Sequence, residues 1–86
     1  MFLHGINNYI LMAVISRPKR KILLELGKGS KHGYEIAKST GLPIGSIYDH
    51  LSELVEEGYV TYREEGRRKI YDLTEKGRRL LDVLRL

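Results

Sequence analysis

The clearest pattern of apolar and polar positions lies in the middle of the chain, between Pro43 and Gly58. Apolar residues recur there every three or four positions, which is the spacing of a helix with one buried side. A proline near the first turn and a glycine just past the last turn are typical of helix boundaries. The residues predicted to face inward are Ile44, Ile47, Leu51, Leu54 and Val55.

Two shorter helices are predicted before this central helix. Ser16 is a good cap for a helix that runs to about Leu26. A second helix over 33–39 follows a glycine-containing loop, in which 30–31 can form a short strand. The link to the central helix is short and contains a glycine, so 33–57 has the form of a helix-turn-helix.

After the central helix, the spacing of apolar residues changes from the helical period to alternation. Strand-type residues over 59–63 and 68–73 flank a polar tip that contains a glycine, which predicts a β-hairpin over 59–73. Thr74 then caps a last helix over 74–86, with an acidic residue in its first turn, where the helix dipole favours negative charge.

The N-terminal segment is apolar, and residues 1–16 contain no Lys, Arg, Asp or Glu. A helical stripe and a buried strand both fit it, so both forms stay open. Such a segment is typical of a subunit contact, although it can also pack on its own domain. Residues 1–15 are therefore the predicted dimerisation segment, together with apolar positions at the end of the last helix. The predicted dimer contacts are Ile6, Tyr9, Ile10, Ala13, Val83 and Leu86.

The order of predicted elements defines the fold class. Three helices, a hairpin and a last helix predict one domain over 1–86 with an α+β, mostly helical fold. A helix-turn-helix followed by a β-hairpin is a winged helix. The sequence therefore predicts a winged helix-turn-helix with a two-stranded β-hairpin wing and an extra N-terminal apolar segment.

Charge is distributed unevenly along the chain. The formal net charge is +4, which suits an anionic partner but is common among proteins. Residues 17–41 carry seven basic and two acidic side chains, net +5. Residues 42–58, which include the central helix, carry four acidic side chains and no Lys or Arg, net −4. This local acidity counts against simple DNA binding by that helix.

Composition argues against several other classes of protein. There is no cysteine, and the three histidines lack the spacing of paired ligands, so no disulfide, metal site or cofactor is predicted. No apolar run reaches the roughly 18 residues of a membrane span, and no leader pattern is visible, which predicts a cytoplasmic protein. No catalytic motif is present, so an enzyme is not expected. The absence of Gln and Trp, with 30% charged residues, is typical of thermophilic proteins.

Three motifs carry a resemblance to a known family. The run His-Gly-Tyr-Glu-Ile-Ala-Lys at 32–38 and the central helix at 45–60, with its Tyr, its leucines and its Glu-Glu-Gly end, resemble the core of PadR-type transcriptional regulators. Residues 66–77 resemble the wing and the next helix start, and the Thr-Glu-Lys-Gly at 74–77 is shared with MarR and ArsR types. The resemblance implies a homodimeric regulator that binds double-stranded DNA. Helices beyond this core usually build the PadR dimer, whereas this sequence ends at Leu86.

DNA contacts are predicted from three places in this fold. The helix before the central helix crosses the DNA backbone, and the first turns of the central helix enter the major groove with small and polar side chains. Arginines and a lysine at the wing tip suit phosphates. The predicted contact residues are Tyr34, Lys38, Gly45, Ser46, Tyr48, Asp49, His50, Arg67, Arg68 and Lys69.

Other interpretations of these residues stay open. Tyr34 and Tyr48 can be core aromatics, and His50 can be an exposed bystander. A second basic cluster at 17–21 can extend a DNA footprint or only keep the domain soluble. The acidic central helix and the apolar N-terminus favour an alternative function, a winged helix that binds another protein in a larger complex without reading DNA. Repression is predicted over activation, and the effector and the operator are not specified.

Overall fold

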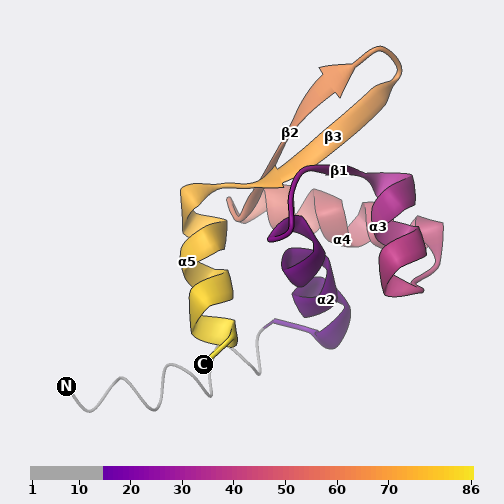
Figure 1. Cartoon of the computed structure of the whole chain (residues 1–86). Helices are drawn as coiled ribbons and strands as arrows, with labels where there is room; N and C mark the ends of the chain where they lie inside the picture. The colour runs from indigo at the N-terminus through magenta and orange to yellow at the C-terminus, as the bar shows by residue number, and fades with distance from the viewer. Residues whose placement is uncertain (1–14) are drawn as a thin grey trace.

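The structure is a computed structural model that describes residues 15–86, and within them it is a winged helix (Figure 1). The predicted α+β, mostly helical fold is confirmed. The elements are α2 (Arg17–Leu26), β1 (Lys31–His32), α3 (Gly33–Thr40), α4 (Ile44–Glu56), β2 (Val60–Glu65), β3 (Arg68–Leu73) and α5 (Glu75–Leu84). Ile6, Tyr9, Ile10 and Ala13, and the choice between helix and strand for the N-terminal segment, lie outside the described residues.

Capping chemistry fixes the start of α2 and the end of α3. The Ser16 hydroxyl accepts a hydrogen bond from the Lys19 N–H at the start of α2, at 3.4 Å. Gly41 closes α3 with a φ of 75°, a left-handed conformation that glycine adopts without steric cost. The turn to α4 is therefore tight, and α3 and α4 form the predicted helix-turn-helix (Figure 1).

A single hydrophobic core joins all four described helices to the sheet. Leu51 and Leu54 of α4 have no exposed surface, nor do Ile22, Leu23 and Leu26 of α2. The core is completed by Ile15, Ile36, Ile47, Val60, Tyr71, Leu73, Leu80 and Leu81. Ile44 was predicted to face inward but is 43% exposed, because it is the first residue of α4 and extends past the helices that cover the rest.

The sheet has one strand more than the predicted wing. Its strand order is β1-β3-β2, and β1 pairs antiparallel with β3. The two-stranded hairpin extends beyond the core at the top of Figure 1. Its strands pair as far as Glu65 and Arg68, so the turn consists only of Gly66 and Arg67. Gly66 has a φ of 63°, as the first central residue of a type II′ hairpin turn requires.

The Thr-Glu-Lys-Gly motif fastens α5 to the turn that follows α4. The Thr74 hydroxyl donates to the Gly58 carbonyl at 2.6 Å and accepts from the Gly77 N–H at 3.0 Å. Lys76 donates to the Glu57 carbonyl at 2.8 Å and lies 4.5 Å from the centroid of the Tyr59 ring. This motif of the family resemblance therefore has a structural role: its hydrogen bonds fix where α4 ends and where the hairpin begins.

The acidic half of α4 is partly neutralised from α2. Lys19 lies 2.9 Å from a Glu53 carboxylate oxygen and 3.9 Å from one of Glu57. This cation comes from α2, the helix packed against α4. The hydrogen bond and charge of Lys19 lower the pKa of Glu53.

This ion pair predicts a specific pH dependence of stability. A carboxyl group whose folded pKa is lowered adds stability above its unfolded pKa, about 4.3, and loses it as the pH falls through the folded value. A Glu53→Gln variant should therefore melt slightly below the unmodified protein at pH 7, and the difference should vanish near pH 2. Thermal unfolding across this range measures the effect. If the melting temperatures of the two proteins differ by the same amount at pH 7 and near pH 2, the ion pair adds no stability, which is common for exposed pairs.

Candidate nucleic-acid interface

A groove of about 550 Å³ lies between the helix-turn-helix and the wing. Its walls come from the start of α3, from α4 and from β3 with its turn. The residues that line it are His32, Gly33, Tyr34, Glu35, Tyr48, Arg67, Arg68, Lys69 and Tyr71. Five of the ten predicted DNA contacts meet here from three separate segments, because β1 and β3 pair and bring the wing beside α3.

Tyr48 is held in this groove by a glycine. A Cβ atom on Gly33 would lie 2.7 Å from Cε1 of the Tyr48 ring and 2.8 Å from its hydroxyl oxygen. The ring therefore packs directly on the backbone at the start of α3. Tyr48 remains 46% exposed and Tyr34 69% exposed, so neither is a core aromatic. Both side chains are available to a ligand at the mouth of the groove.

His32 and Glu35 shape the start of α3. A Glu35 carboxylate oxygen accepts from the His32 backbone N–H at 2.8 Å and lies 2.7 Å from Nδ1 of its ring. These hydrogen bonds lower the pKa of Glu35. The single acidic side chain on the groove wall is therefore already engaged with a neighbour, which limits its repulsion of an anionic ligand.

The wing supplies the cations of the groove. Arg67 lies in the hairpin turn and Arg68 opens β3, and both are exposed. The Lys69 ammonium lies 4.5 Å from the centroid of the Tyr62 ring. In the register of the hairpin, Lys69 is opposite Glu64 and Arg68 is opposite Glu65, so two of these cations face acidic positions of β2.

Tyr71 forms the floor of the groove and is 5% exposed. Burial raises the pKa of its hydroxyl, so the group stays protonated at neutral pH. The sequence prediction omitted four residues of the groove: His32, Gly33, Glu35 and Tyr71. Strand alternation, which places Tyr71 on the same side of β3 as Lys69, was the signal available for Tyr71. For His32 the signal was its place at the helix cap.

The other predicted contacts lie outside the groove. Gly45 and Asp49 are exposed on the outer side of α4, and Ser46 is half-buried beside them. Lys38 is exposed in the last turn of α3, at the end opposite the groove. Nδ1 of His50 is buried without a hydrogen-bond partner and lies 4.0 Å from Glu53, so this edge of the ring is closed to a ligand.

Metal binding and membrane insertion are two further properties on which the described residues bear. Among 15–86, no group of three or more His, Cys, Asp or Glu side chains is placed to hold a metal ion. The same residues contain no helix of the length and apolarity needed to cross a membrane.

Comparison with known proteins gives the family. Residues 22–83 match the model of the transcriptional regulator PadR-like family, which is more than half of the chain. The chain belongs to the PadR-like family. The match covers the helix-turn-helix, the wing and most of α5, and so includes every groove residue of this PadR-like domain.

Two individual proteins are similar to this chain. An uncharacterized protein of Methanocaldococcus jannaschii is 43% identical over 47 residues, which are 55% of this chain but 17% of that protein. The crystal structure of RV1404 from Mycobacterium tuberculosis superposes with a TM-score of 0.83 over 96% of this chain and 59% of its own, at 16% identity. The PadR-like chain thus spans less than two thirds of each of these two proteins.

A third similar structure is described as a homodimeric winged helix-turn-helix DNA-binding domain, Mb0332 from Mycobacterium bovis. It is 25% identical to this PadR-like chain, with a TM-score of 0.75. The match covers 95% of this chain and 75% of that structure.

Proposed function

We propose that this PadR-like chain is a cytoplasmic transcriptional regulator that binds double-stranded DNA as a homodimer and represses transcription. The observation that carries the proposal is the groove between α3, α4 and the wing. The groove brings two exposed tyrosines together with three cations, and hydroxyl and cationic donors are what DNA phosphates bind.

The outer face of α4, beside this groove, is suited to contact with the edges of DNA bases. Gly45 has nothing within 4 Å of the position of a Cβ atom, so the backbone can approach base edges closely. Asp49 is exposed near it and can accept a hydrogen bond from a cytosine amino group. The groove then holds the DNA backbone while the first turns of α4 face the bases.

Dimerisation is proposed from apolar side chains at the end of α5. Leu86 is 94% exposed and Val83 is half-buried, and both follow positions that complete the core. Two copies joined here, together with the N-terminal segment, would present two recognition helices to successive major grooves about 34 Å apart. Occupation of a promoter by such a dimer excludes the polymerase, which is why we propose repression.

Selection of bound sequences from a random duplex pool tests the proposal most broadly. Enrichment of a palindrome is expected, because a twofold dimer reads two inverted half-sites. Binding without enrichment of any sequence would show that the protein does not read DNA sequence. Absence of binding to every duplex, with a stable folded protein, would instead favour a protein-interaction module.

Gly33 provides a second and narrower test. A Gly33→Ala substitution should displace the Tyr48 ring and lower duplex affinity by up to about tenfold, the value of one well-placed hydrogen bond. The dependence of affinity on salt should not change, because the tyrosine contact is uncharged. Fluorescence anisotropy at several salt concentrations measures both quantities.

The control for this test removes the ring itself. In a Tyr48→Ala background, Gly33→Ala should cost no further affinity, since the side chain it displaces is gone. A full additional loss in that background would show that Gly33 acts through something other than Tyr48.

A further inference from the structure

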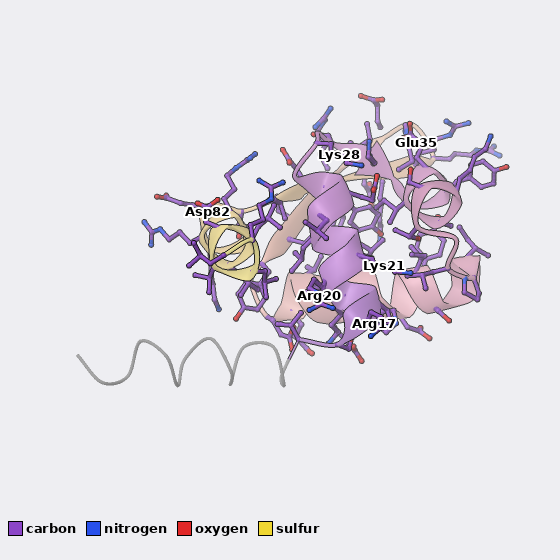
Figure 2. All side chains as sticks on the ribbon, turned by 60° about the horizontal axis from the view of Figure 1, so that its bottom comes forward. Arg17, Arg20, Lys21, Lys28, Glu35 and Asp82 are labelled. Carbon is purple, nitrogen blue, oxygen red and sulfur yellow. The ribbon has the colours of Figure 1, made fainter. Side chains whose placement is uncertain are left out.

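Three basic side chains lie on the side of α2 that faces away from the core, and the proposed DNA groove does not use them. They are Arg17, Arg20 and Lys21, and they are called here the α2 basic face. Figure 2 views the molecule onto this side of α2, where all three are labelled. Arg17 and Lys21 are exposed and Arg20 is half-buried.

The three cations of this face form no ion pair with a carboxylate in the part of the chain that the structure describes. Residues 1–14 contain no Asp or Glu that could supply a partner. By contrast, Lys19 of α2 and Arg78 and Arg79 of α5 each lie within 4.0 Å of a carboxylate oxygen.

The arrangement is unfavourable for α2 itself. Its first turn contains no acidic residue, and Arg17 and Arg20 place positive charge at the positive end of the helix dipole. Arg17 and Lys21 are four residues apart and repel each other along one side of the helix. Core packing does not require these charges, because they face outward. Local arrangements that cost stability without a structural gain are typical of functional surfaces.

The α2 basic face and the groove lie on different sides of the molecule. The inward residues of α2, such as Leu23 and Leu26, are completely buried in the core that also holds Leu51 of α4. The groove is formed by α3, β3 and a different side of α4. A straight duplex seated in the groove therefore leaves the α2 basic face free.

We propose that the α2 basic face binds the phosphate backbone of a second duplex segment, so that the domain can bridge two stretches of DNA. The inference rests on the proposed function in taking duplex DNA as the anion. Long cationic side chains that form no ion pair suit a repeating anion, and each DNA strand carries a phosphate every 3.4 Å or so along the axis. Among residues 15–86, the apolar surface on this side of α2 is Leu24, 36% exposed, which is too small for a stable protein interface.

A bridging assay tests this directly. One duplex is fixed to beads, protein is added, and retention of a second, fluorescent duplex is measured. The Arg17→Ala/Lys21→Ala variant should retain at least about fivefold less of the second duplex, while its affinity for a single duplex stays within about twofold. Its melting temperature should equal or exceed that of the unmodified protein, because unfavourable charge leaves the first turn of α2.

The matched control is Arg78→Ala/Arg79→Ala on α5. It removes the same net charge from two exposed cations that already have carboxylate partners, and it should bridge normally. The inference is overturned if the unmodified protein binds the first duplex but does not retain the second. It is also overturned if both double variants bridge alike, or if the α2 variant loses the first duplex equally. Failure of the unmodified protein to bind the first duplex would instead overturn the proposed function.

Discussion

Replacing Gly77 by alanine is expected to destabilise the domain by about 3 kcal/mol, the upper range for forced overpacking. A Cβ atom at this position would overlap the Tyr59 carbonyl oxygen, which is backbone and cannot rotate away. Relief requires α5 to move off the turn after α4, and the hydrogen bonds of Thr74 to that turn would be lost. Thermal unfolding should show a melting temperature lowered by roughly 15 °C for a domain of this size.

Gly45→Ala is the matched control for this prediction. Gly45 lies in a helix with open space around it, so alanine meets no atom there. Stability should be unchanged or higher by up to about 1 kcal/mol, because alanine favours the helix. Similar melting temperatures for the two variants would show that the contact between Gly77 and Tyr59 does not constrain the fold.

The Arg67→Ala/Arg68→Ala variant is expected to lose duplex affinity on the order of a hundredfold, from two charge-assisted hydrogen bonds. Both residues line the groove at the wing, and neither belongs to the core. The loss should be similar for all DNA sequences, and the slope of log affinity against log salt should become shallower by about 1.8, or 0.9 for each contact. Anisotropy titrations from low to physiological salt measure both effects.

The same α5 variant, Arg78→Ala/Arg79→Ala, controls for bulk charge. Its two arginines are exposed, do not line the groove, and are paired to Asp72 and Glu75. It should bind duplexes nearly as well as the unmodified protein. An equal loss in both variants would mean that total charge, rather than the wing, governs affinity.

The fold was largely predictable because the boundaries of its helices depend on local chemistry. Ser16, Gly41 and Thr74 act at helix ends through their own hydroxyl or backbone conformation, and these signals are visible in the sequence. The sequence predicted a possible short strand before α3 but not that it joins the sheet. This strand, β1, has two residues and is defined by its pairing with β3. Such pairing between distant segments has no periodic signal in the sequence.

The candidate site was predicted in part, for a related reason. Wing cations and helix tyrosines could be named from their elements, but the groove arises where α3, α4 and β3 meet. The contact between Gly33 and Tyr48 joins positions fifteen residues apart, so no spacing rule indicates it. The sequence did not indicate the cation beside the acidic half of α4, because the packing of α2 on α4, which brings Lys19 to Glu53, is a tertiary contact.

The central claim is that the groove between the helix-turn-helix and the wing holds the DNA. Nuclear magnetic resonance titration of the labelled protein with a duplex obtained from the random pool tests it most directly. The largest shifts are expected at Gly33, Tyr48 and Arg67 to Lys69, with little change in the middle of α5. Shifts concentrated on α5 or absent from the groove, despite tight binding, would contradict the claim.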